Sequence, residues 1–169
     1  MEGFAEARLP NATLTLVGGA TPELDQILSR QPNNIKQIGH RPQHELNYHY
    51  GRSHCFVMAS VEEGMAMVQM QAMACGLPMI CTTNTGGEDL LLLGGSDGKK
   101  CSHGIQQFPA GFLIPIHSPK AIAFCLRRLV NEAGLWESMR QAALETANQK
   151  LDWAAYGQRA ISHYTRLLK

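Results

Sequence analysis

Short apolar runs alternate with longer stretches of mixed polarity over the first two thirds of the chain, and the last third carries only the longer stretches. The short runs end at glycine or polar turns, which is typical of buried strands, whereas the longer stretches place apolar residues at helical spacing. The predicted strands are 12–17, 34–38, 54–58, 79–82 and 111–114. The predicted helices are 2–7, 21–30, 42–51, 65–75, one opening at 88, 119–131, 134–149 and 153–168.

This order predicts an α/β fold in which helices cover both faces of a parallel sheet. Ligands of such sheets bind at the carboxyl ends of the strands, so the turns after 17, 38, 58 and 82 are expected along one edge. Residues 94–109 show no periodicity and are predicted to form a long surface loop. The chain opens on a helix-like segment, although a parallel α/β domain normally begins on a strand.

Composition limits the possible partners and the compartment. The 169 residues suffice for a single domain, 1–169, and the net charge of +1 without a basic block argues against a nucleic-acid surface. Five cysteines, an odd number without C-x-x-C spacing, favour reduced thiols in a cytoplasmic protein. No apolar run reaches the roughly 18 residues that a membrane span requires.

The segment from Glu63 to Met79 is the strongest candidate for a binding site. An acid and a glycine lead into an apolar helix, whose first N–H groups and partial positive charge suit an anionic, hydroxyl-rich ligand. The first-turn N–H groups are expected to be those of Met65, Ala66 and Met67. Glu63 is either an acceptor for ligand hydroxyls or a solvated loop acid, and Gly64 either admits a ligand or forms an ordinary turn.

Other polar residues leave two interpretations open. Gln69 and Gln71 lie in an apolar helix, and Gln71 either meets a polar ligand or satisfies neighbouring backbone groups. His40 either lines a pocket or belongs to a surface turn, and the turn 85–88 either shapes the same edge or only starts a helix. The sequence lacks H-E-x-x-H, D-x-D, P-loop, G-x-S-x-G and G-x-G-x-x-G patterns, so no metal is expected.

Residues 63–78 resemble the E-G-F-G-L-x-x-x-E-A-M-A-C-G-x-P signature of the retaining GT-B glycosyltransferases of family 4, also called group 1. Further segments are similar to other motifs of that family in the same order: 12–19, 35–46, 78–88, 111–116 and 153–164. The resemblance implies a Rossmann-like, three-layer α/β/α domain, the C-terminal half of a GT-B fold, with C-terminal helices at about 119–168. It also implies that the family's first strand, which should precede Glu2, is missing.

The resemblance further implies a role for each candidate residue. In the family, the acid at the position of Glu63 is the catalytic-site acid and contacts the hydroxyls of the donor sugar. Backbone groups at the positions from Gly64 to Met67 approach the sugar and the diphosphate. The residue at the position of Gln71 binds the ribose. The turn near the nucleotide base consists of Gly39, His40 and Arg41. The implied donor is a nucleoside diphosphate sugar, with UDP and GDP both open, and neither cofactor nor metal is expected.

Two departures from the family pattern qualify these expectations. Gln71 replaces a glutamate, which removes a charge-assisted hydrogen bond of about 1 kcal/mol or more. The family's Arg and Lys that contact the diphosphate, and its N-terminal acceptor domain, are absent, so the chain is expected to be a fragment with little or no activity of its own. Any contact with a membrane is expected to be peripheral and to come from the parent protein.

Two other functions compete with sugar transfer. The chain could be a non-catalytic, glycosyltransferase-like binding or assembly module, which Gln71 favours. It could also belong to another GT-B enzyme, such as a phosphorylase or epimerase relative, which the run from Glu63 disfavours.

Overall fold

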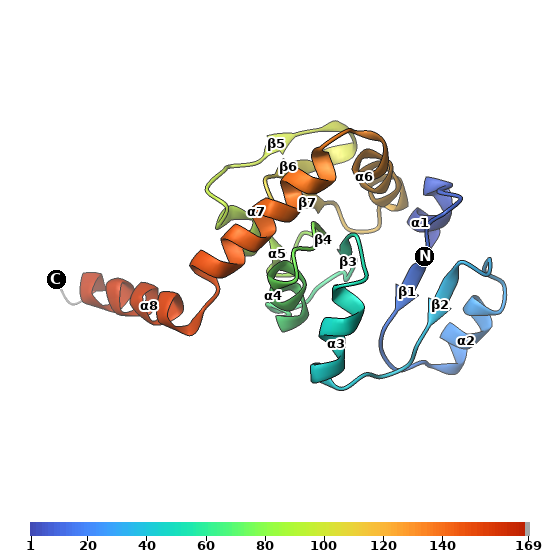
Figure 1. Cartoon of the computed structure of the whole chain (residues 1–169), viewed down its shortest axis with the longest axis horizontal. Helices are drawn as coiled ribbons and strands as arrows, with labels where there is room; N and C mark the ends of the chain where they lie inside the picture. Colours follow the sequence, from blue (N-terminus) through green and yellow to red (C-terminus); the bar gives the residue numbers. More distant parts are fainter. Residues whose placement is uncertain (168–169) are drawn as a thin grey trace.

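The computed structural model describes residues 1–167 as alternating helices and strands (Figure 1). The first half contains α1 (Glu2–Ala7), β1 (Leu14–Leu16), α2 (Pro22–Leu28), β2 (Ile35–Gln37), α3 (Gln43–Tyr50), β3 (Phe56–Met58), α4 (Met67–Ala74) and β4 (Met79–Thr82). The second half contains α5 (Gly87–Leu92), β5 (Lys99–Lys100), the short helix η1 (Ser102–Gly104), β6 (Gln106–Phe108), β7 (Gly111–Ile114), α6 (Pro119–Asn131), α7 (Leu135–Lys150) and α8 (Trp153–Leu167). The predicted alternation is confirmed, and position 168 of the last predicted helix lies outside the described residues.

The strands form two sheets rather than the continuous parallel sheet that was expected. β1 and β2 pair in parallel, and a five-stranded sheet has the order β3-β4-β7-β6-β5. The N–H of Leu14 donates to Asn34 and the carbonyl of Leu16 accepts from Ile38. Backbone groups of successive strand residues point to opposite sides, so those of Thr15 point away from β2. No ladder joins β1 to β3 within residues 1–167, although Leu14, Leu16 and Val57 pack on one hydrophobic cluster.

The prediction of a loop over 94–109 is wrong in part. β5 and β6 lie inside this segment, and both run antiparallel to their neighbours. β6 forms a hairpin with β7 that closes between Phe108 and Gly111. The two glutamines at the start of β6 lack the apolar alternation that indicates a strand, and the antiparallel pairing with β7 supplies the stability instead.

Helices cover both faces of the larger sheet. On one face, Ile80, Phe112 and Ile114 pack with residues of α1 and α6, and on the other, Met79 and Cys81 pack with residues of α4, α5 and α7. Alternate residues of β4 thus pack into the hydrophobic clusters on opposite faces of the sheet, which explains why all four residues of this strand are buried. This three-layer arrangement confirms the predicted Rossmann-like class.

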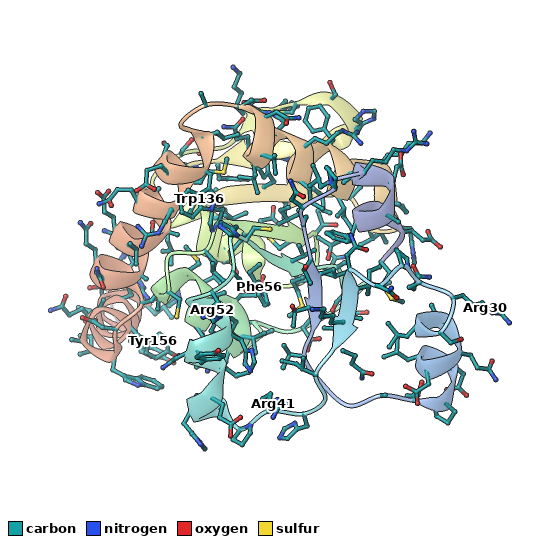
Figure 2. All side chains as sticks on the ribbon, turned by 45° about the vertical axis from the view of Figure 1, so that its right-hand side comes forward. Arg30, Arg41, Arg52, Phe56, Trp136 and Tyr156 are labelled. Atoms are coloured by element: carbon teal, nitrogen blue, oxygen red, sulfur yellow. The ribbon has the colours of Figure 1, made fainter. Side chains whose placement is uncertain are left out.

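The C-terminal helices differ in how firmly they are attached. Trp136 of α7 donates its indole N–H to the carbonyl of His54 at 2.7 Å, which anchors α7 beside the start of β3 (Figure 2). In contrast, α8 has no buried residue and exposes an apolar stripe of Trp153, Tyr156, Ile161, Tyr164 and Leu167. Among the helices of residues 1–167, none is long and apolar enough to cross a membrane.

Candidate functional site

The Glu63 loop connects β3 to the N-terminus of α4. The helix begins at Met67, two residues later than predicted, and Ala66 is its N-cap in an extended conformation. The N–H groups of Met65 and Ala66 therefore lie ahead of the helix, and the prediction that they belong to its first turn is wrong. The first-turn groups are those of Met67, Val68 and Gln69, and the N–H of Gln69 donates to the Ala66 carbonyl at 3.0 Å.

The turn after β4 explains the late start of α4. The N–H of Glu63 donates to the carbonyl of Asn84 at 2.9 Å, and a Cβ atom placed on Gly86 would lie 2.8 Å from the Cα of Met65. These contacts hold Glu63 and Met65 in loop conformations that a continued helix could not adopt. Glu63, Gly64 and Met67 are all exposed, so a ligand can reach this loop and the carboxylate of Glu63.

Cys81 lies beneath this turn but does not supply a nucleophile. Burial, with a smaller contribution from Glu88, raises the pKa of the Cys81 thiol to about 12. The thiol is therefore neutral at physiological pH, and Cys81 contributes packing rather than chemistry.

Gln71 lies on the other side of α4, toward α3. The hydroxyl of Tyr50 donates a long hydrogen bond of 3.5 Å to Oε1 of Gln71, and burial together with Cys75 raises the pKa of that tyrosine. Gln71 also borders an open hollow of about 480 Å³ with Gln43, His44 and Asn47 of α3. The Gln71 amide therefore accepts a hydrogen bond from Tyr50 and also lines a hollow that is open to a ligand.

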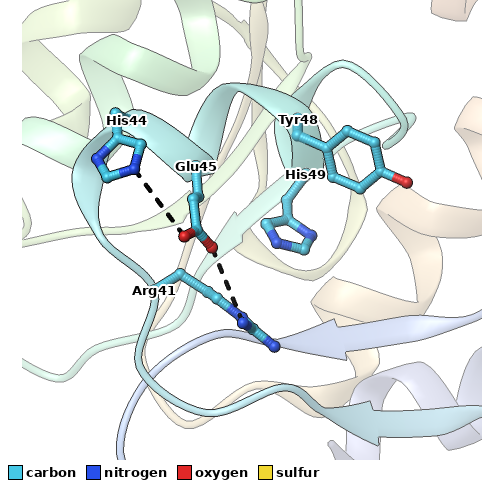
Figure 3. A pocket seen from close by; sticks show the side chains of 5 residues that line it. All are labelled: Arg41, His44, Glu45, Tyr48 and His49. Carbon is cyan, nitrogen blue, oxygen red and sulfur yellow. Dashed lines mark ion pairs between the residues drawn. The ribbon is translucent and has the colours of Figure 1, made fainter.

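The residues from Gly39 to Arg41 precede α3. Of these three, Arg41 borders a second open hollow of about 490 Å³, which His44, Glu45, Tyr48 and His49 of α3 also line (Figure 3). Arg41 and His44 both approach Glu45, at 3.8 and 3.9 Å. These pairs are exposed and contribute little to stability, so the Arg41 guanidinium is free to exchange its partner for a ligand anion or base. The carbonyl of Gly39 accepts the N–H of Gly18 at 3.0 Å, which ties the turns after β1 and β2 together.

The predicted site residues thus form two groups. Glu63 and Met65 of the loop before α4 lie against the turn 84–87, whereas Arg41 and Gln71 border the hollows beside α3. Both groups follow the carboxyl ends of strands, as the sequence predicted. Sequence reasoning did not assign Gln69, which is buried and donates to Thr85. The only signal for it was an amide within an apolar helix.

Comparison with known proteins identifies the family. The family model described as glycosyl transferases group 1 matches residues 2–132. The chain belongs to this family. The match covers the Glu63 loop, the turn 84–87 and the residues beside α3, so both groups of candidate residues lie within the part of the chain that the family shares.

The curated relatives of the chain are longer than the chain itself. The chain is 26% identical over 125 residues to a D-inositol 3-phosphate glycosyltransferase of Kineococcus radiotolerans. The aligned segment covers 74% of this chain and 27% of that relative. The chain is 35% identical over 51 residues to the O-antigen chain mannosyltransferase B of Escherichia coli, covering 30% of the chain and 13% of the relative. The chain therefore spans about a quarter or less of these relatives' length.

Several solved structures share the fold of this chain. A sucrose-phosphate synthase from Thermosynechococcus elongatus superposes with a TM-score of 0.73 at 21% identity, covering 99% of this chain and 42% of that one. The Anabaena protein HepE in complex with UDP-glucose superposes with a TM-score of 0.72 at 21% identity, covering 97% of this chain and 44% of HepE. The C-terminal domain of the Francisella tularensis group 1 protein LpcC superposes with a TM-score of 0.69 at 22% identity, covering 90% of this chain and 79% of that domain.

Proposed function

We propose that the chain is the donor-binding half of a retaining glycosyltransferase, which moves a sugar from a nucleoside diphosphate to an acceptor hydroxyl. The observation that carries this proposal is the exposed Glu63 loop that enters the N-terminus of α4, at the carboxyl end of β3, in a chain of the group 1 family. That position combines free N–H groups with a carboxylate, the pair of features that a sugar diphosphate needs.

The proposed chemistry is electrostatic. The N–H groups of Met67 and Val68 and the dipole of α4 stabilise the negative charge that develops on the leaving diphosphate, and Glu63 accepts hydrogen bonds from the sugar hydroxyls. Gln71 contacts the ribose, and the turn from Gly39 to Arg41 borders the base. We propose neither a protein nucleophile nor a cofactor or metal for this reaction.

Several observations support the role of a half enzyme. The chain covers 79% of an isolated C-terminal domain, that of LpcC, but under half of the longer chains of the sucrose-phosphate synthase and HepE. Within the part of the chain that the structure describes, the β1–β2 pair has no ladder to β3, and a doubly wound sheet of order 3-2-1-4-5-6 has one strand at that place. A further strand and an acceptor-binding domain are therefore expected in the complete protein, and the isolated chain is expected to show little turnover. Five free thiols favour a reducing, cytoplasmic location.

UDP and UDP-glucose are the first ligands to test, because HepE is solved with each of them. Calorimetric titration should compare the chain with Glu63→Ala and with the matched control Glu62→Ala, which removes the neighbouring exposed acid. We expect Glu63→Ala to weaken the binding of UDP-glucose about tenfold or more, since a charge-assisted hydrogen bond is lost, and to leave the affinity for UDP nearly unchanged. Equal effects of the two variants would contradict the role of Glu63, and GDP-sugars serve as the parallel series.

A non-catalytic binding module remains the second candidate. It is favoured by the amide at Gln71, whose Oε1 already accepts from Tyr50. A module used only for assembly would bind none of the nucleotides saturably, so the same titrations separate that function from a donor-binding domain.

A further inference from the structure

Gln69 is a buried polar residue that packing alone does not explain. Its side chain is completely buried in the first turn of α4, where its Nε2 donates to the carbonyl of Thr85 at 2.6 Å. Its Oε1 is buried without a hydrogen-bond partner. An apolar side chain of similar size would fill this position without an unpaired oxygen, so the bond to Thr85 is the distinctive property of the residue.

Thr85 belongs to a turn that links two loops of the site. The Thr85 hydroxyl donates to the carbonyl of Thr82 at 2.7 Å, and the Thr82 hydroxyl in turn donates to the carbonyl of Ser60. The carbonyl of Asn84, next to Thr85, accepts the N–H of Glu63 at 2.9 Å. The turn is thus bonded both to the segment after β3 and, through Gln69, to α4.

Close packing makes the turn and the Glu63 loop move together. A Cβ atom on Gly86 would lie 2.8 Å from the Cα of Met65, and one on Gly87 would lie 2.6 Å from the Sγ of Cys81. The backbone of the turn therefore rests directly on Met65 above and on β4 below, and it has no room to shift unless the loop shifts with it.

We propose that Gln69 is a positioning residue of the donor site: through Thr85 it fixes the turn 84–87, and through Asn84 the turn fixes the backbone of Glu63. Gln69 itself does not reach the ligand, because it is buried beneath the loop. The inference rests on the proposed function for the role of Glu63, whereas the mechanical link between the three segments stands on the contacts alone.

Amide hydrogen exchange of the whole chain tests this link. Glu63 lies in an exposed loop, yet its N–H should be protected in the unmodified chain, and Gln69→Met should accelerate its exchange by about tenfold or more. The matched control is Met73→Leu, a volume-conserving change at a fully buried position of the same helix, which should leave Glu63 unaffected. Free exchange of Glu63 in the unmodified chain, which needs no variant, or equal exchange in both variants, would overturn the proposal.

Titration with UDP and UDP-glucose separates positioning from general stability. Gln69→Met should weaken the binding of UDP-glucose more than the binding of UDP, since only the sugar depends on Glu63. If Gln69 were purely structural, the variant would weaken the binding of both ligands alike, and this result would overturn the proposal. If the unmodified chain bound neither nucleotide, the proposed function would fail, and the exchange measurement would still decide whether Gln69 fixes the loop.

Discussion

At the scale of single residues, the candidate site depends on contacts between positions that lie far apart in the sequence. Gln69 and Gln71 are both amides in an apolar helix, and the sequence marks both as unusual without distinguishing them. The structure separates them, because Gln69 bonds to Thr85, sixteen residues later, whereas Gln71 borders an open hollow. Local patterns do not reveal which face of a short helix meets a distant turn.

Gly86 provides a direct test of the packing between the turn and the loop. Its φ of +68° is strained for other residues, and an added Cβ would meet the backbone of Met65. We expect Gly86→Ala to lower the free energy of unfolding by about 1–3 kcal/mol, measured by urea denaturation.

The matched control for that change is Gly95→Ala. Gly95 has a similar φ of +79° but no heavy atom within 4 Å of an added Cβ, so its replacement carries the backbone strain alone and should cost less than Gly86→Ala. Similar losses in both variants would show that the turn does not rest on Met65.

At the scale of helices and strands, the sequence predicted the elements well where one local signal decided them. Thr21 accepts the N–H of Leu24 at 3.3 Å as the cap of α2, as the Thr-Pro pattern indicated. The start of α4 was predicted two residues early, since contacts with a distant turn, rather than a capping side chain, determine it. β6 was missed because its pairing with β7, rather than its own composition, makes it a strand.

The attachment of α8 leads to a prediction at this scale. Because none of the described residues of α8 is buried, ending the chain after Asp152 should change the free energy of unfolding by less than about 1 kcal/mol in urea denaturation. Ending it after Gly134 should abolish cooperative unfolding, because α7 buries Met139, Ala143 and Ala147 against the sheet. A large loss from the shorter deletion would mean that the apolar stripe of α8 packs on the domain in solution.

At the scale of the whole molecule, the strands of residues 1–167 form two separate sheets. The larger sheet has helices on both faces, while the β1–β2 pair packs on the same hydrophobic cluster and has no ladder to the larger sheet in the described part of the chain. The alternation of strands and helices predicted the class of fold, but the split could not be predicted, because register and neighbours depend on which strands are present to pair. The Glu63 loop and the turn 84–87, which we propose bind the donor, do not depend on the β1–β2 pair, since β3, β4 and α4 position them.

The most direct test of the account is to map UDP-glucose onto the isotope-labelled chain by two-dimensional NMR. The account predicts saturable shifts concentrated in residues 63–69 and 84–87, with a second group at 39–41 and 71 from the nucleoside. Saturable shifts confined to other parts of the chain, or no shifts at millimolar ligand, would contradict the proposal that this edge binds a nucleoside diphosphate sugar.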